Sequence, residues 1–200
     1  MKNGLYGLVV CGGKSSRMGN DKSMISYHGE PQRYFLYKML LQFCEKAFIS
    51  CNKTQAENMD DRYAFLTDLP GFEDCGPISA ILTAQKTYPD RNFLVIGCDY
   101  PFITSQELQH FLLSINNNLP AAAFYNEESS LYEPLLAWYS KESARDISRL
   151  FDDEKYSLQH FLKFSNAGRF TDFSPESIKS VDTPEEFAEA SNLLRSKSIS

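Results

Sequence analysis

Apolar residues gather in short, nearly unbroken runs along the first half of the chain. Residues 5–11, 47–51 and 93–98 are hydrophobic over almost their whole length. That pattern is typical of strands buried on both faces of a sheet. Residues 63–66 form a weaker run of the same kind. The pattern therefore predicts four strands in the first hundred residues.

Helical spacing separates these runs. Residues 31–45 carry apolar side chains three and four positions apart, and a second helix is predicted to begin at Gly76 and Pro77. Thr104 with Glu107 three residues later predicts a capping box that opens a third helix, which ends near residues 116–118. Because strands and helices alternate, the sheet is expected to be parallel.

The pattern changes after Pro120. Residues 121–125 and 135–139 predict two strands joined by the polar stretch 126–130, which indicates an antiparallel or mixed part of the sheet. Further on, the chain predicts helices over 141–151 and 157–164, two short strands, and a last helix capped by Thr183 with Pro184 at its first position. We therefore expect one α/β domain over residues 1–200, with a Rossmann-like three-layer α/β/α fold, a mostly parallel central sheet and a mixed second half.

Composition limits the classes of partner. The 200 residues are 42% hydrophobic and 23% charged, which excludes a disordered or fibrous chain. Lys and Arg number 20 against 26 Asp and Glu, so the net charge is −6. No overall positive field attracts nucleic acid or an anionic membrane, so neither is expected as a partner. Any phosphate ligand would need a local site.

The cysteines and the N-terminal run point to the cytoplasm. The run 5–11 is interrupted by Gly7 and leads into glycines, unlike the hydrophobic core of a signal peptide. The cysteines are odd in number and scattered, without a C-x-x-C pair, so reduced thiols are expected rather than a zinc or iron–sulfur site. They are Cys11, Cys44, Cys51, Cys75 and Cys98.

A glycine-rich loop at residues 12–22 follows the first predicted strand. It matches neither the Walker motif, which would need glycine in place of Leu8, nor G-x-G-x-x-G. Paired glycines, Gly12 and Gly13, let backbone N–H groups approach a phosphate chain. Three cations accompany them, namely Lys14, Arg17 and Lys22. The loop therefore favours polyphosphate binding, and the alternative is a solvated turn with basic residues.

Carboxylates and an amide follow the other predicted strands. Asp99 comes directly after the run 93–98, at the edge where α/β sheets bind ligands, and could hold Mg²⁺. Asn52 and Asp68 follow the second and third strands and could hydrogen-bond a base or ribose. Asp182, before the last helix, is a further carboxylate at this edge. For each of these residues the alternative is an ordinary turn or capping role.

Histidine offers no obvious catalytic group. His28, His110 and His160 have no metal-ligand or triad-like neighbour in the sequence, so none is assigned a role in catalysis.

Five motifs together resemble the molybdenum cofactor guanylyltransferases. In chain order they are G-G-K-S-S-R-M-G-x-D-K at 12–22, G-x-P at 29–31, G-P-I at 76–78, G-C-D-Y-P-F at 97–102 and D-T-P-E-E at 182–186. The resemblance covers almost the whole chain. The first motif is shared with nucleotidyltransferases generally, so it indicates the chemistry better than the substrate.

The resemblance implies transfer of GMP from GTP to molybdenum-molybdopterin, with release of pyrophosphate and a requirement for Mg²⁺. It implies a nucleotide-binding half over residues 1–102 and an acceptor-side half over 103–200, with cofactor delivery proteins as possible partners. The catalytic residues would be Arg17, Lys22 and Asp99, and the metal ligands Asp99 and, as a second candidate, Asp182. GTP contacts would fall on Val10, Cys11, Gly12, Gly13, Lys22, Asn52, Asp68 and Asp99.

The sequence departs from the family pattern at several positions, and the departure before Thr183 leaves the choice of substrate open. Val10 and Cys11 stand where Leu-Ala is usual, a packing change that backbone contacts should tolerate. Ser180, Val181 and Asp182 stand where Asn-x-Asn often precedes Thr-Pro, and Asp before Thr-Pro also occurs in related cytidylyltransferases. A cytidylyltransferase or another small-molecule nucleotidyltransferase is therefore the first alternative. A nucleotide-binding module without activity is the second.

Overall fold

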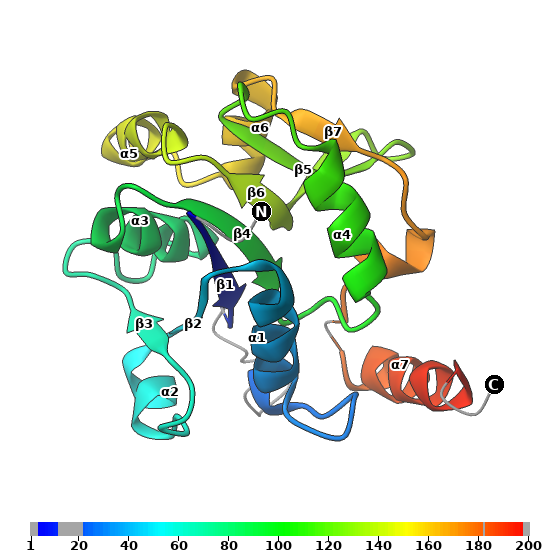
Figure 1. Cartoon of the computed structure of the whole chain (residues 1–200). Coiled ribbons are helices and arrows are strands. Elements are labelled where there is room, and N and C mark those ends of the chain that lie inside the picture. The colour runs from blue at the N-terminus through cyan, green and yellow to red at the C-terminus, as the bar shows by residue number, and fades with distance from the viewer. Residues whose placement is uncertain (1–3, 12–21, 182, 198–200) are drawn as a thin grey trace.

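A computed structural model describes residues 4–11, 22–181 and 183–197. The described strands form one seven-stranded sheet in the order β3-β2-β1-β4-β6-β5-β7 (Figure 1). In chain order they are β1 (Leu5–Val10), β2 (Lys46–Cys51), β3 (Phe65–Thr67), β4 (Asn92–Gly97), β5 (Ala121–Asn126), β6 (Leu131–Tyr139) and β7 (Gly168–Phe170).

The sheet is parallel except at β6. Strand β1 pairs in parallel with both β2 and β4, and β3 pairs in parallel with β2. Strand β6 runs antiparallel to β4 and β5, while β7 is parallel to β5. The pair Ile96 and Leu136 ends the β4–β6 ladder, so the first residues of β6 extend past the carboxyl end of β4. The expected mostly parallel sheet with a mixed second half is confirmed.

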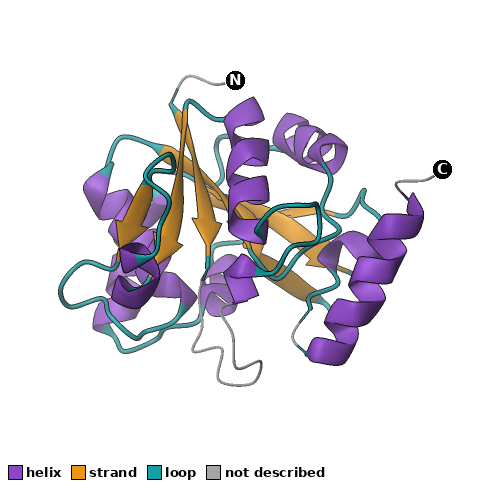
Figure 2. Cartoon of the chain, turned by 90° about the horizontal axis from the view of Figure 1, so that it is seen from below, coloured by secondary structure: helices purple, strands orange, loops and turns teal. Residues whose placement is uncertain are grey.

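Helices cover both faces of the sheet (Figure 2). Side chains alternate along β1, so Val9 packs in the cluster that contains α1 and α4, while Leu8 packs against α3, α5 and α6. These are α1 (Gln32–Phe43), α3 (Pro77–Thr87), α4 (Ser105–Ser114), α5 (Ser143–Asp152) and α6 (Leu158–Phe164). The three-layer α/β/α arrangement is therefore confirmed.

Shorter elements complete the chain. Helix α7 (Pro184–Lys197) packs against the loop after β4, where Ala190 clusters with Phe102 and Val181. Helix α2 (Lys53–Glu57) and the 3₁₀ turn η1 (Lys22–Met24) follow β2 and the glycine-rich loop respectively. Two short strands were expected after α6, and the structure has β7 and then the 3₁₀ turn η2 (Pro175–Ile178). Within the described ranges, no helix is long and apolar enough to cross a membrane.

Candidate functional site

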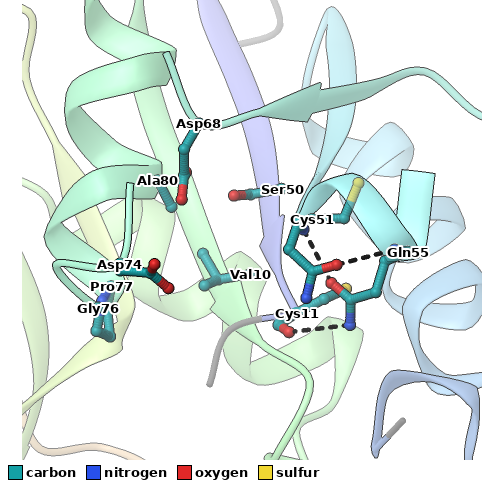
Figure 3. A pocket seen from close by; sticks show the side chains of 11 residues that line it. Val10, Cys11, Ser50, Cys51, Gln55, Asp68, Asp74, Gly76, Pro77 and Ala80 are labelled. Atoms are coloured by element: carbon teal, nitrogen blue, oxygen red, sulfur yellow. Dashed lines mark hydrogen bonds between the residues drawn. The ribbon is translucent and has the colours of Figure 1, made fainter. Parts of the chain in front are cut away.

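The carboxyl ends of β1, β2 and β3 surround a cavity of about 340 Å³ (Figure 3). Because these strands are parallel, the residues that follow them meet at one edge of the sheet. Val10, Cys11, Asn52 and Asp68, which the sequence analysis singled out, all line this cavity. Seven further residues complete the lining, and they are Ser50, Cys51, Gln55, Asp74, Gly76, Pro77 and Ala80.

Asn52 opens helix α2 as part of a capping box. Its Oδ1 accepts a hydrogen bond from the Gln55 backbone N at 2.9 Å, and Gln55 Oε1 accepts one from the Asn52 backbone N at 3.0 Å. Gln55 Nε2 also donates to the Cys11 carbonyl at 3.5 Å, which joins α2 to the end of β1 (Figure 3). Since the cap occupies Oδ1, the carboxamide nitrogen is the part of Asn52 suited to a ligand.

Carboxylates line the opposite side of the cavity. Asp68 and Asp74 lie on the α3 side, across from Cys51 and Gln55 (Figure 3). Burial raises the pKa of the half-buried Asp68 carboxyl, and the charges of Glu73 and Asp74 raise it further. This acidic wall repels phosphate and accepts hydrogen bonds from N–H and O–H groups. It therefore suits the base or ribose of a nucleotide better than its phosphates.

Only part of this lining could be recognised from the sequence. Gln55 was not singled out, although its place three residues after Asn52 matches the capping-box spacing that identified Thr104. Gly76 and Pro77 were noted as a helix start and a motif, without a binding role. Asp74 has a positive φ of 61° in the loop before α3, and no sequence pattern marked it.

The phosphate-binding part of the hypothesis lies outside the described residues. Gly12, Gly13 and Arg17 belong to the undescribed stretch 12–21, and the side chain of Lys22 is also outside the description. The structure does describe Cys11, the residue that precedes this stretch. Cys11 is buried at the end of β1, and its backbone N donates to the Ser50 carbonyl at 3.1 Å.

Asp99 lies after β4, apart from the residues that line the cavity. A Cβ at Gly97 would collide with Asp99 Oδ1 and stand 3.1 Å from Leu135 Cβ, so the glycine leaves the space that the carboxylate occupies. The Asp99 carbonyl accepts a hydrogen bond from the Val181 backbone N at 3.0 Å. The chain leading to Asp182 is thus held beside Asp99, although Asp182 itself lies outside the described residues.

Glu133 is a second carboxylate near Asp99, and the sequence analysis missed it. It accepts a hydrogen bond from the Tyr100 hydroxyl at 2.8 Å through Oε2. Burial raises the pKa of Glu133, and the charge of Asp99 adds to this, while the Tyr100 hydrogen bond lowers it. Glu133 also lines a cavity of about 540 Å³ between the β5–β6 hairpin and the segment after β7.

A bulge in β6 accounts for the position of Glu133. Ala123 pairs with Ala137 but Tyr125 pairs with Tyr132, so residues 133–136 face a single residue of β5. Bulges of this kind turn side chains out of the regular pleat and are frequent beside active sites. A lone charged residue before a proline in an apolar run was the sequence signal that could have marked Glu133.

His28 supports the loop that carries Asp99. Its ring stacks on Phe35 of α1 with centroids 3.8 Å apart, and Nε2–H donates to the Pro101 carbonyl at 3.0 Å. Burial lowers the pKa of His28, which favours the neutral ring that this hydrogen bond uses. The histidine thus holds residues 99–102 against α1.

The donors at this edge fit Mg²⁺. Among residues with a described placement, no group of three or more His, Cys, Asp or Glu side chains is arranged to hold a metal ion by itself. Mg²⁺ in nucleotide sites needs only one or two carboxylates, because phosphate oxygens and waters fill its other positions. The hard carboxylate oxygens of Asp99, beside the segment that leads to Asp182, match that requirement.

Comparison with known proteins gives one family. The model of the MobA-like NTP transferase domain matches residues 7–169. The chain is 34% identical over 168 residues to a Synechocystis molybdenum cofactor biosynthesis bifunctional protein, covering 82% of the chain and 43% of that protein. It is 25% identical to a probable molybdenum cofactor guanylyltransferase of Bacillus cytotoxicus, covering 92% of the chain and 94% of that protein.

A solved structure shares the fold over nearly the full length. Molybdopterin-guanine dinucleotide biosynthesis protein A from Archaeoglobus fulgidus superposes with a TM-score of 0.79 at 21% identity. The match covers 96% of this chain and 99% of that one. The α/β fold with its seven-stranded mixed sheet is therefore that of known nucleotidyltransferase structures.

Proposed function

Because the chain belongs to the MobA-like NTP transferase family, we propose that this nucleotidyltransferase moves GMP from GTP to molybdenum-molybdopterin. The products are molybdopterin guanine dinucleotide and pyrophosphate, and Mg²⁺ is required. Relatives of nearly the same length, named as probable molybdenum cofactor guanylyltransferases, support this assignment. The reaction is assigned to the cytoplasm, in keeping with the scattered cysteines and the interrupted N-terminal apolar run.

The cavity lined by Asn52 and Asp68 is the observation that carries the proposal. Asp68 and Asp74 line it, and carboxylates are suitable acceptors for the N1–H and 2-amino groups of guanine or for ribose hydroxyls. The phosphates would then extend past Cys11 into the glycine-rich loop, where Gly12 and Gly13 offer backbone N–H groups. The acidic wall would thus contact the base or ribose of the nucleotide, and the basic loop would contact its negatively charged phosphates.

The transfer needs no general base. The nucleophile is a terminal phosphate oxygen of the acceptor, which is already ionised at pH 7. It attacks the α-phosphorus in line, a new P–O bond forms, and the bond to the bridging oxygen breaks so that pyrophosphate leaves. Arg17 and Lys22 are assigned to offset the negative charge on the transferring and leaving groups. Holding both substrates in line supplies much of the rate.

Asp99 is assigned to hold the Mg²⁺, with Asp182 as a second ligand. When bound, the ion neutralises charge on the phosphate oxygens. The absence of a side chain at Gly97 leaves the space in which the Asp99 carboxylate lies, and His28 holds the following turn through the Pro101 carbonyl.

Residues 103–200 are assigned to the acceptor. The cavity of about 540 Å³ beside Glu133 belongs to this half, and the Tyr100–Glu133 hydrogen bond connects it to the Asp99 turn. A carboxylate is a suitable partner for a pterin, whose 2-amino and N3–H groups are donors on one edge. Proteins that carry the cofactor would supply this acceptor and take up the product.

Thermal unfolding against nucleotides tests the proposal. The purified protein is heated with GTP, CTP, ATP or UTP, each with and without Mg²⁺. A ligand at 100 times its dissociation constant adds about 2.7 kcal/mol, which raises the midpoint of a chain of this length by roughly 5–11 °C. We expect that shift with GTP and Mg²⁺.

The other outcomes decide between the alternatives. The sequence Asp182-Thr183-Pro184 favours a cytidylyltransferase as the second candidate, and a shift with CTP in place of GTP would support it. A Mg²⁺-dependent shift with GTP but no pyrophosphate release in the presence of acceptor would indicate a binding module. The absence of a shift with every nucleotide would contradict the proposed function.

A further inference from the structure

Two cysteine thiols lie side by side at the carboxyl ends of the neighbouring strands β1 and β4. Cys11 follows β1 and Cys98 follows β4, and the two strands are hydrogen-bonded neighbours with Val10 opposite Gly97. The Cys98 backbone N continues this ladder by donating to the Val10 carbonyl at 3.1 Å. The sulfur atoms lie 3.3 Å apart, and the residues are 6% and 7% exposed. The pair is thus held together by the backbone of two adjacent strands.

The strand order makes this place important. Chain connections lead from β1 to β2 on one side of β1 and from β3 to β4 on the other, so β1 and β4 flank the topological switch point of the sheet. Cys11 leads into the glycine-rich loop and Cys98 immediately precedes Asp99. A covalent bond between the two sulfurs would tie these two segments together.

We propose that Cys11 and Cys98 form an oxidative modification site at which hydrogen peroxide converts the two thiols into a disulfide. The Cys11 sulfur attacks one peroxide oxygen, the O–O bond breaks, and a sulfenic acid and one water form. The Cys98 sulfur then attacks the sulfenic sulfur, and a second water leaves. Overall, two thiols and one peroxide give one disulfide and two waters, and a dithiol reductant reverses the change.

The geometry supports both the access and the selectivity. Cys11 lines the 340 Å³ cavity, which brings a molecule as small as peroxide next to this residue. Neighbouring strands place the two Cα atoms within the range that a disulfide spans. Cys75 is the most exposed of the five cysteines, and its sulfur contacts the Glu73 carbonyl at 3.4 Å. It therefore serves as a matched control for oxidation at an accessible thiol.

The bond would disturb the site. A disulfide holds its sulfurs about 2.0 Å apart, so the 3.3 Å separation must close by about 1.3 Å. The ends of β1 and β4 are packed, and displacement of a site by about 1 Å can cost about 100-fold in rate. This inference goes beyond the proposed function, and only its effect on GTP binding and transfer rests on that function.

Mass spectrometry of the full chain tests the chemistry independently of activity. The reduced protein is treated with hydrogen peroxide, quenched with catalase, alkylated with N-ethylmaleimide under denaturing conditions, and analysed intact and as peptides. We expect a loss of two hydrogens, three of the five thiols alkylated, and a peptide pair joined through Cys11 and Cys98. Oxygen adducts alone, or a bond to another cysteine, would overturn the proposal.

Variants then connect the bond to the site. Wild type and Cys75→Ala should each form the linked peptide and lose at least tenfold in GTP affinity or transfer rate on oxidation, with recovery in dithiothreitol. Cys98→Ala should show neither the bond nor a change between its own oxidised and reduced samples, and Cys11→Ala provides a second test by mass. An equal loss in Cys98→Ala and wild type would contradict the proposed effect. If reduced wild type binds no nucleotide, the proposed function fails while the mass result still judges the disulfide.

Discussion

The proposed transfer depends most on Asp99, the residue assigned to hold Mg²⁺, and on the residues that position it. The carboxylate occupies space that only a glycine at position 97 leaves open, and its backbone carbonyl receives the Val181 N–H. The sequence predicted Asp99 from its place after an apolar strand, since such positions face the ligand edge of an α/β sheet. The role of Gly97 depends on how the chain turns after β4, which brings the Asp99 side chain to where a Cβ at position 97 would stand. Hydrophobic periodicity does not show that turn.

Asp99→Asn should abolish most of the transfer and leave the fold intact. The amide keeps the shape of the side chain but lacks the negative charge that holds Mg²⁺, so we expect a rate about 10²- to 10³-fold lower. Steady-state pyrophosphate release with acceptor measures it. The control is Asp90→Asn, an exposed carboxylate just before the other end of β4. Undiminished turnover in Asp99→Asn would remove this residue from the metal site.

Gly97→Ala should displace the Asp99 carboxylate. The added Cβ would collide with Asp99 Oδ1 and crowd Leu135, so we expect a loss of stability of about 1–3 kcal/mol and a weaker Mg²⁺-dependent response. Gly168→Ala is matched, because its Cβ would stand 3.1 Å from Ala122 Cβ in a strand outside the nucleotide half. Urea unfolding should show a loss in both variants. Only Gly97→Ala should change the Mg²⁺ dependence of GTP binding, and a normal response there would refute the positioning role.

Asp68→Asn should stabilise the free protein at neutral pH and weaken nucleotide binding. The pKa of Asp68 is raised in the folded state by burial, so the folded state retains a proton that the unfolded state releases as pH rises above 3.8. This carboxyl therefore lowers stability as pH rises through its folded pKa. Denaturant unfolding from pH 3.5 to 7 should show that the free energy of unfolding of the variant rises relative to that of wild type as the pH increases. A constant difference between them would contradict this.

At the scale of elements, hydrophobic periodicity predicted the helices and strands whose side chains are buried in the core. The runs 5–11 and 93–98 became β1 and β4, because both faces of those strands are covered by helices. Helix α2 was missed because it is only five residues long and has no buried residue. Strand β6 begins at Leu131, four residues earlier than expected, since Pro134 lies in the bulge where the ladder is interrupted.

Substitutions at Asn52 should separate helix capping from ligand binding. Asn52→Ala removes both roles, with a cost of about 0.5–2 kcal/mol for the cap. Asn52→Asp keeps an acceptor for the Gln55 N–H but replaces the amide that we propose contacts the ligand with a carboxylate. We expect wild-type stability and weaker GTP binding for Asn52→Asp, measured by calorimetry and thermal unfolding. Unchanged affinity in Asn52→Asp would mean that Asn52 serves only the helix.

At the scale of the whole molecule, strand order brings together what the sequence separates. The ends of β1, β2 and β3 form the acidic cavity, and β4 carries Asp99 on the other side of β1. The single antiparallel strand among those described, β6, brings Glu133 to the same region from the second half of the chain. The hydrogen bond between Tyr100 and Glu133 joins residues 33 positions apart, and nothing local in the sequence specifies it.

Substitutions in the proposed nucleotide half and in the proposed acceptor half should therefore affect different substrates. Glu133→Gln removes the charge proposed to meet the acceptor, so we expect its KM for molybdenum-molybdopterin to rise roughly tenfold or more. The GTP affinity of that variant should match wild type, whereas Asn52→Asp should show the reverse pattern. Steady-state kinetics with each substrate varied in turn measures the split. Equal effects on both substrates in Glu133→Gln would argue against a separate acceptor half.

The most direct measurement is guanylyl transfer itself. The reduced protein is incubated with Mg²⁺, molybdenum-molybdopterin and GTP labelled at the α-phosphate, and the pterin product and pyrophosphate are quantified together. The account predicts equal amounts of labelled molybdopterin guanine dinucleotide and pyrophosphate, lost without Mg²⁺ and in Asp99→Asn. Label that never reaches the pterin, or that arrives only from CTP, would contradict it.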